Sequence, residues 1–182
     1  METIMKLLCI TGMPCAGKTT AIKILSSKFS VVSMGDVIRR EMKEKNIDED
    51  MREYSTELRK KDKGYVAKIC IPEITEIAKI SKTCIVDGIR NYEEVGEFRK
   101  LYNVVLLAIH ASPKKRYERF TNRQRSDDNL TYDGFINRDI AELNWGLGNV
   151  IALSDLIISN EDDDAEKFKE NLIVEISRIE KL

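Results

Sequence analysis

Eight consecutive residues near the start of the chain have the types and spacing of a phosphate-binding loop. They are Gly12, Met13, Pro14, Cys15, Ala16, Gly17, Lys18 and Thr19, and they satisfy the pattern G-x-x-x-x-G-K-[ST]. Two glycines let the backbone curl around an anion with its N–H groups pointing inward, and a helix that begins near Lys18 adds the positive end of its dipole. The pattern predicts an ATP site. The alternative is a glycine turn with a solvated lysine.

Three hydroxyl or amine side chains of this segment have separate expected roles. Lys18 is predicted to bridge the β- and γ-phosphates of ATP, and Thr19 to hold Mg2+ through its hydroxyl. Thr20 places a second hydroxyl near the α-phosphate. ATP and Mg2+ are therefore the expected cofactors.

Two glycine-arginine pairs follow apolar, strand-like runs further along the chain. Gly35 and Arg39 follow the second run, and Gly88 and Arg90 follow the third. The carboxyl ends of the strands are where open α/β sheets bind ligands, and the planar fork of arginine suits bidentate anion binding. These four residues are predicted to bind the acceptor of the phosphoryl group. The alternative makes the arginines surface ion-pair partners of nearby glutamates such as Glu41 and Glu93.

An aspartate accompanies each of these pairs. Asp87 ends an apolar strand, which is the position of a carboxylate that orients Mg2+ through water. Asp36 is predicted either to assist at the site, in binding or as a proton acceptor, or to cap the helix that follows it.

A third group of charged residues comes later in the chain. It contains Arg116, Arg119, Arg123, Arg125, Asp127, Asp128 and Arg138. The spacing i, i+3 and i+7 places the first three on one face of a helix. Because phosphoryl transfer depends on positioning and on neutralising charge, arginines from a lid over the site would meet that need.

The pattern of apolar residues predicts the elements that must position these groups. Strand-like runs lie at 6–11, 29–33, 83–86, 103–110 and 156–159, and segments with helical periodicity separate them. Strands that alternate with helices favour an α/β fold with a parallel sheet covered on both faces. A length of 182 residues fits one domain over 1–182.

Composition excludes several other classes of protein. No apolar run reaches the 18 residues or more of a membrane span, and the start does not read as a signal peptide, so we expect a soluble, cytoplasmic protein without a membrane partner. A net charge of -1 argues against a nucleic-acid partner. The four cysteines form no C-x-x-C pair, which argues against a zinc site or a disulfide framework.

Taken together, these motifs resemble the nucleoside monophosphate kinase superfamily over nearly the whole chain. The likeness is greatest to adenylate kinases and to an archaeal group related to them and to dephospho-coenzyme A kinase. The matching segments are the ATP loop at 12–19, Gly35-Asp36 with Arg39, Asp87-Gly88 with Arg90, Arg119 with Arg123, and Arg125-Ser126-Asp127-Asp128-Asn129 with Arg138. Two features of that superfamily's acceptor site are absent: the proline expected just before Arg90, and a glutamine that would read the acceptor base.

The resemblance implies further roles and a fold. Arg119 would pack on adenine, Arg123 would bind phosphate, and Arg125 and Arg138 would contact the phosphate in transfer. The implied architecture is a P-loop sandwich with a five-stranded parallel sheet in the order 2-3-1-4-5. It includes an acceptor-binding insertion near 36–80 and a short lid near 124–132.

Three functions remain open from the sequence. The leading hypothesis is ATP-dependent phosphorylation of a nucleoside monophosphate such as AMP. The second is phosphorylation of a hydroxyl, as in dephospho-coenzyme A kinase, which requires a proton acceptor such as Asp36. The third is a P-loop ATPase switch or RNA-associated factor, against which the acceptor arginines argue.

Overall fold

The computed structural model describes residues 4–122, 131–162 and 164–181, in which strands and helices alternate. The elements are, in order, β1 (Lys6–Thr11), α1 (Lys18–Leu25), β2 (Ser30–Ser33), α2 (Met34–Glu44), α3 (Met51–Lys61), α4 (Tyr65–Ala78), β3 (Thr83–Asp87), α5 (Tyr92–Arg99), β4 (Asn103–His110), α6 (Pro113–Thr121), α7 (Tyr132–Asn144), α8 (Leu147–Ala152), β5 (Leu156–Ser159) and α9 (Ala165–Lys181). Within the described ranges, no helix combines the length and the apolar character needed to cross a membrane.

The strands form one parallel sheet in the order β2-β3-β1-β4-β5, which confirms the expected architecture. Strand β1 lies in the middle, between β3 and β4. Its pairing with β3 places Asp87 beside Ile10, and the pairing of β2 with β3 places Ser33 beside Asp87. Because all strands run in the same direction, the segments that follow β1, β2 and β3 start at the same edge of the sheet.

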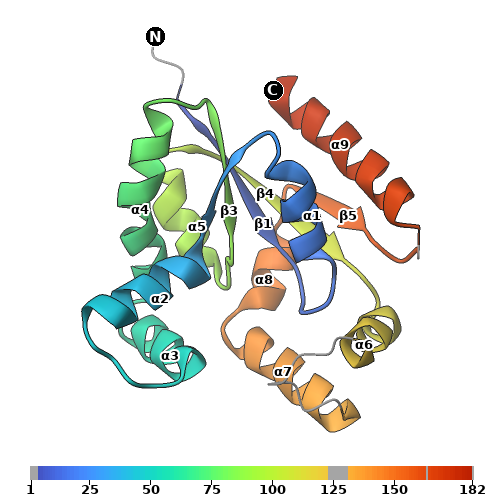
Figure 1. The fold of residues 1–182 in the computed structure, drawn as a ribbon, viewed down its shortest axis with the longest axis horizontal. Helices are drawn as coiled ribbons and strands as arrows, with labels where there is room; N and C mark the ends of the chain where they lie inside the picture. The colour runs from blue at the N-terminus through green and yellow to red at the C-terminus, as the bar shows by residue number, and fades with distance from the viewer. Residues whose placement is uncertain (1–3, 123–130, 163, 182) are drawn as a thin grey trace.

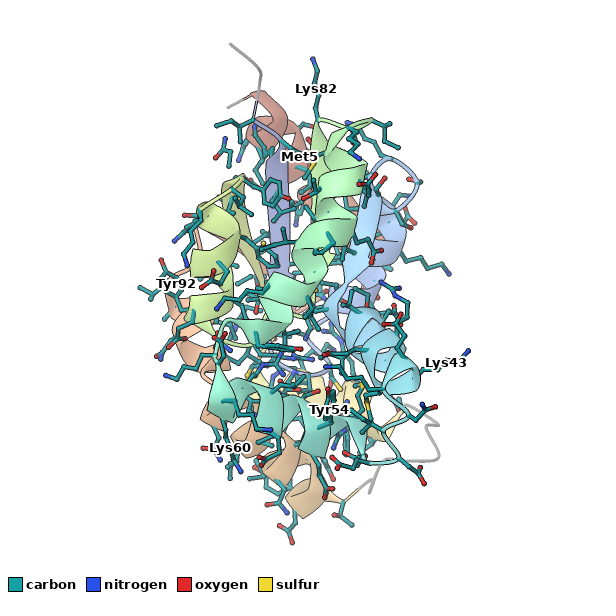
Figure 2. All side chains as sticks on the ribbon, turned by 90° about the vertical axis from the view of Figure 1, so that its left-hand side faces the viewer. Met5, Lys43, Tyr54, Lys60, Lys82 and Tyr92 are labelled. Carbon is teal, nitrogen blue, oxygen red and sulfur yellow. The ribbon has the colours of Figure 1, made fainter. Side chains whose placement is uncertain are left out.

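Both faces of the sheet are covered, so the central strands are apolar on both sides. Leu7 and Cys9 face a core shared with α2, α4, α5 and α8, whereas Leu8 and Ile10 face a core shared with α1 and α9. Figure 1 shows α4 and α5 on one side of the sheet and α1 and α9 on the other. Figure 2 looks onto the first of these layers, where α4 lies between α5, which begins at Tyr92, and α2, which carries Lys43.

The segment expected to be an acceptor-binding insertion folds as the helices α2, α3 and α4. Of these, α4 contributes Val66, Ala67, Cys70 and Ile74 to the core beside the sheet, so it acts as the crossover helix and continues through Pro72. Helices α2 and α3 lie beyond the carboxyl ends of the strands, opposite α6 and α7 (Figure 1). The candidate site lies between these two groups.

Candidate functional site

The phosphate-binding loop joins β1 to α1, and its glycines are required by the space around them. Gly12 has a φ of 145°, and a Cβ on it would lie 2.3 Å from the backbone oxygen of Ile109. Gly17 has a φ of 112°, and a Cβ there would lie 2.2 Å from Nδ2 of Asn160. Neither position tolerates a side chain, because φ is in the left-handed region and the space is filled.

Side chains from other elements hold the outer side of this loop. Asn160, after β5, donates from Nδ2 to the backbone oxygen of Ala16 at 2.8 Å. Arg119 of α6 donates from Nη2 to the backbone oxygen of Asn160 at 2.9 Å. The side chain of Cys15 is buried against Phe120 and Phe135, so this residue contributes its backbone, and not its thiol, to the loop.

A cavity of about 160 Å3 opens beside the loop and gathers several of the groups predicted to handle ATP phosphates. Its lining consists of Pro14, Cys15, Gly17, Lys18, Thr19, Asp87, Arg90, Arg138 and Glu142. Lys18, Thr19 and Asp87 therefore lie together, as expected. Thr20 is exposed and does not line this cavity.

Lys18 is half-buried. Its Nζ donates to the backbone oxygens of Gly12 at 2.5 Å and Met13 at 3.0 Å. Burial, with a smaller effect from the Arg90 cation, lowers the pKa of the Lys18 amine to about 8. Burial raises the pKa of Asp87, against the opposing effects of Lys18 and Arg90. A cation and a carboxylate thus share a site that is poorly solvated.

A second cavity, of about 480 Å3, lies between the helices α2 and α3 on one side and the segment after β3 and helix α7 on the other. Its lining consists of Met34, Gly35, Ile38, Arg39, Asp50, Met51, Arg52, Ser55, Arg59, Gly88, Arg90, Arg138, Glu142 and Trp145. We call it the acceptor cavity. It contains the predicted Gly35, Arg39, Gly88 and Arg90, and it shares Arg90, Arg138 and Glu142 with the phosphate-loop cavity.

The acceptor arginines pair with carboxylates, but not with the expected ones. Nη1 of Arg90 lies 3.0 Å from Oε2 of Glu142, whose side chain is 12% exposed. Arg39 pairs with Asp36. The predicted partners pair elsewhere, Glu41 with Lys45 and Glu93 with Lys63, so that alternative was wrong about the partners.

Asp36 occupies the first turn of α2 without capping the helix. The N-cap is Ser33, whose hydroxyl accepts a hydrogen bond from the backbone N–H of Asp36. The Asp36 side chain is exposed, and its hydrogen bond from Arg39 is the main reason why the pKa of its carboxyl is lowered. The alternative in which Asp36 caps this helix was therefore wrong, because the N-cap lies three residues earlier.

Arg116 differs from the prediction that placed it among lid arginines. Its guanidinium is buried and forms a bidentate ion pair with Asp139, with N–O distances of 2.8 and 2.7 Å. It also donates to the backbone oxygen of Pro14 at 3.3 Å and lies over the ring of Phe135. Arg116 therefore fastens α6 and α7 to the phosphate loop. The predicted Arg123, Arg125, Asp127 and Asp128 lie outside the described residues, as does most of the expected lid.

Nine of the residues that line the acceptor cavity were not singled out for the site from the sequence, among them Arg52, Ser55, Arg59, Glu142 and Trp145. Arg59 is buried, and Glu94 accepts hydrogen bonds from its Nε and from the backbone N–H of Arg90. Glu94 also completes a capping box with Asn91 at the start of α5. The spacing Asn91-x-x-Glu94 is a recognisable sequence signal for that box, and it marks the segment after β3 as a helix start.

Comparison with known proteins identifies relatives over almost the whole chain. A family model described as an AAA domain matches residues 11–132. A UPF0200 protein of Sulfurisphaera tokodaii is 44% identical over 172 residues, which cover 92% of this chain and 93% of that protein. UPF0200 proteins of Pyrococcus abyssi and Methanocaldococcus jannaschii are 41% and 38% identical, over 95% and 94% of this chain and 96% and 91% of their own length.

Solved structures share the fold at low sequence identity. The shikimate kinase of Bacteroides thetaiotaomicron has a TM-score of 0.62 at 13% identity and covers 98% of this chain and 99% of its own. The dephospho-CoA kinase of Campylobacter jejuni has a TM-score of 0.55 at 15% identity, with coverages of 96% and 97%. TT1252 from Thermus thermophilus reaches a TM-score of 0.62 at 14% identity, with coverages of 97% and 98%. These likenesses establish a P-loop kinase fold and do not single out adenylate kinases.

Proposed function

We propose that this chain, which belongs to the UPF0200 family and contains an AAA-type domain, transfers a phosphoryl group from ATP to the phosphate of a small acceptor. A nucleoside monophosphate such as AMP is the first acceptor to test. The observation that carries the proposal is the sharing of Arg90 and Arg138 between the phosphate-loop cavity and the acceptor cavity. Cations at that junction would face the donor phosphates on one side and the acceptor phosphate on the other.

The residues of the phosphate-loop cavity fit Mg-ATP by their chemistry. Gly12 and Gly17 keep the loop free of side chains that would fill its cradle. The Thr19 hydroxyl and the Asp87 carboxylate are oxygen ligands of the kind that Mg2+ prefers. Mg2+, when bound, would neutralise charge on the phosphates, while Lys18 would bind the β- and γ-phosphates and Arg138 the group in transfer.

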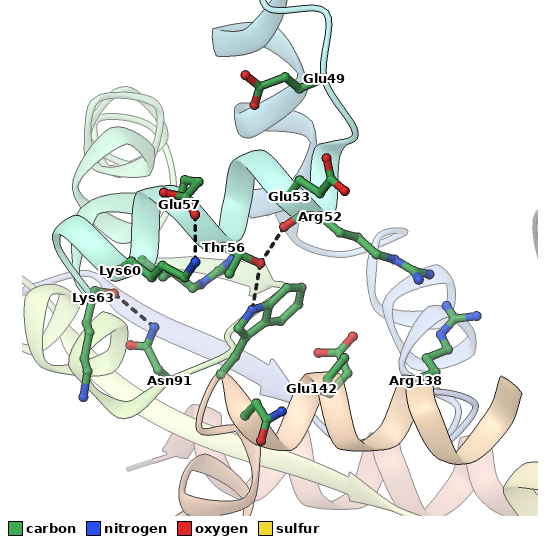
Figure 3. A pocket seen from close by; sticks show the side chains of 14 residues that line it. Glu49, Arg52, Glu53, Thr56, Glu57, Lys60, Lys63, Asn91, Arg138 and Glu142 are labelled. Atoms are coloured by element: carbon green, nitrogen blue, oxygen red, sulfur yellow. Dashed lines mark hydrogen bonds and ion pairs between the residues drawn. The ribbon is translucent and has the colours of Figure 1, made fainter. Parts of the chain in front are cut away.

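The acceptor cavity favours an anionic ligand. Five arginines line it, against the two carboxylates of Asp50 and Glu142. The arginines are Arg39, Arg52, Arg59, Arg90 and Arg138. Arg52 is exposed and extends from α3 toward Arg138 of α7 (Figure 3). Two guanidinium groups from opposite walls suit a phosphate, whose oxygens accept bidentate hydrogen bonds.

The state of Asp36 favours a phosphate acceptor over a hydroxyl acceptor. A hydroxyl kinase needs a base that takes the acceptor proton, and such a base works best with a pKa near the working pH. Hydrogen bonding to Arg39 instead lowers the pKa of Asp36, and its side chain is 55% exposed. A phosphate is already ionised and needs no base.

An ATP-consumption assay across AMP, CMP, UMP, GMP and dephospho-coenzyme A tests the proposal, with Asp36→Asn as the diagnostic variant. With a phosphate acceptor, this variant should keep turnover within about tenfold of the wild type, because no proton has to be removed. A loss of about 100-fold or more, together with activity on dephospho-coenzyme A alone, would overturn the phosphate assignment in favour of a hydroxyl kinase.

A further inference from the structure

A third cavity, of about 830 Å3, joins the acceptor cavity between α3 and the end of α7. The two share Arg52, Arg59, Arg138, Glu142 and Trp145. We call the new one the side cavity. Small-molecule sites usually measure about 300–1,000 Å3, so the acceptor and side cavities together offer far more room than a phosphate group requires.

Trp145 forms part of the wall where the two cavities meet, and its ring is held in place from two directions. Its Nε1 donates to Oγ1 of Thr56 on α3 at 3.1 Å, drawn as a dashed line in Figure 3. The guanidinium of Arg59 lies 5.2 Å from the centre of the ring. An aromatic ring that is fixed in this way, and still half-exposed, is a preorganised stacking surface.

Arg59 is itself fixed by a carboxylate that is fully buried. Both Nε and Nη2 of Arg59 lie 2.9 Å from Oε1 of Glu94, which is 0% exposed. The other oxygen of Glu94 accepts the backbone N–H of Arg90 at 2.7 Å. The Glu94 carboxylate therefore positions Arg59, which contacts the ring of Trp145. It also positions the backbone at Arg90, one of the predicted acceptor arginines.

The side cavity also presents hydrogen-bonding groups that suit the edge of a heterocycle. Glu53 of α3 contributes a carboxylate, and Asn144 at the end of α7 contributes an amide. The Thr56 hydroxyl is already bonded to Trp145 and to the backbone oxygen of Arg52, and Glu57 is paired with Lys60. A carboxylate accepts hydrogen bonds from the N–H and amino groups of a ring, and an amide can both donate to and accept from its edge.

We propose that the side cavity binds a planar nitrogen heterocycle of the acceptor, stacked on Trp145, with the acceptor phosphate held by Arg52 and Arg138. The proposal rests on the function proposed above and specifies the second half of the acceptor. Arg52 and Arg138 lie at one end of the side cavity in Figure 3, so a nucleoside monophosphate can place its phosphate there and its base toward Trp145. The acceptor is thereby a nucleotide and not a simple sugar phosphate.

The only tryptophan of the chain is Trp145, so its fluorescence reports on this site without turnover. We expect the nucleoside monophosphate that the enzyme phosphorylates to quench or shift this fluorescence, and ribose 5-phosphate to have little effect. Trp145→Leu should raise the KM for the nucleotide by about tenfold or more, because stacking of a base on an aromatic ring is worth about 5- to 100-fold in binding. The KM of Trp145→Phe should lie between those of the wild type and Trp145→Leu.

Tyr102→Leu is the matched control. Tyr102 is also half-buried, its hydroxyl also bonds a threonine, Thr75, at 2.9 Å, and it lines none of the three cavities. The KM of Tyr102→Leu for the nucleotide should remain that of the wild type. Thermal melting would establish that each variant is folded.

Equal fluorescence responses to ribose 5-phosphate and to the nucleotide would overturn the inference. So would a KM of folded Trp145→Leu within about twofold of the wild type, and both results would leave the kinase proposal standing. Quenching by nucleotides in a protein that phosphorylates none of them would instead refute the kinase proposal and retain the heterocycle site.

Discussion

Replacing Lys18 by methionine should abolish phosphoryl transfer and, at the same time, leave the fold slightly more stable. The transfer reaction loses a cation that neutralises phosphate charge, a kind of loss that typically costs at least about 10²- to 10³-fold in turnover. The fold loses a charge that is held in a poorly solvated place, since burial is the main cause of the lowered pKa of Lys18. Methionine keeps the apolar stem of the side chain and removes the charge.

The size of the stability change follows from the pKa. The difference between an ordinary amine pKa of 10.5 and a value of about 8 corresponds to roughly 3 kcal/mol of penalty for the charged form. The half-exposed position of Lys18 reduces this figure, and the two hydrogen bonds to Gly12 and Met13 are worth about 1 kcal/mol each. The net gain for Lys18→Met is therefore about 1 kcal/mol at neutral pH, or about 2–4 °C in Tm.

The gain should depend on pH in a defined direction. The folded-state pKa of Lys18 lies below the unfolded-state value. Above pH 10.5 the amine is neutral in both states and the wild type carries no penalty from this group. The penalty grows as the pH falls from 10.5 and is complete below about 8. The advantage of Lys18→Met should therefore be complete below pH 8 and shrink toward pH 10.5. Thermal unfolding of both proteins at several pH values measures it. A methionine variant that is less stable than the wild type at pH 7, or one that keeps more than a tenth of its turnover, would refute this reasoning.

Two further substitutions examine the arginines. Arg90→Ala should raise the KM for the acceptor much more than the KM for ATP, since Arg90 is proposed to bind the acceptor phosphate, whereas ATP would also be held by the phosphate loop and Lys18. Equal changes in the two constants in steady-state kinetics would contradict this. Arg116→Met should destabilise the protein by about 3–5 kcal/mol because it leaves Asp139 buried without its partner, and the double variant with Asp139→Leu should recover much of that loss in chemical denaturation. A double variant no more stable than the single one would show that packing around Arg116 matters more than its charge.

The phosphate loop and the sheet were predictable because their signals are local. The motif at 12–19 specifies a backbone shape through Gly12 and Gly17, and both have the left-handed φ that the motif requires. The apolar runs at 6–11, 103–110 and 156–159 coincide with β1, β4 and β5. The middle strand β1 is apolar from Leu7 to Ile10 because it is buried on both faces, whereas β5 lies at the edge of the sheet and leaves Ile157 exposed. Strand order then followed from family resemblance and not from periodicity.

The acceptor side was less predictable because it depends on helices that meet only in the folded chain. Helix α3 is polar along most of its length, so nothing in its sequence distinguishes the buried Arg59 from the exposed Arg52. Arg116 lies one turn before Phe120 and shares its buried side of α6, and that spacing was a usable sign that Arg116 is a structural residue. The cluster of charges instead favoured a place among the arginines of a lid over the site, which was wrong for Arg116.

Helix α7 explains why donor and acceptor groups are positioned together. Arg138 and Glu142 are one turn apart and so lie on the same side of α7, and Trp145 follows directly after its last residue. The neighbouring Asp139 is clamped by both nitrogens of Arg116, which also binds a backbone oxygen of the phosphate loop. A bidentate pair fixes the rotation of a helix as well as its distance, because both N–O contacts must be kept. The loop that would hold ATP therefore sets the direction in which α7 presents its cation, its carboxylate and its tryptophan to the acceptor.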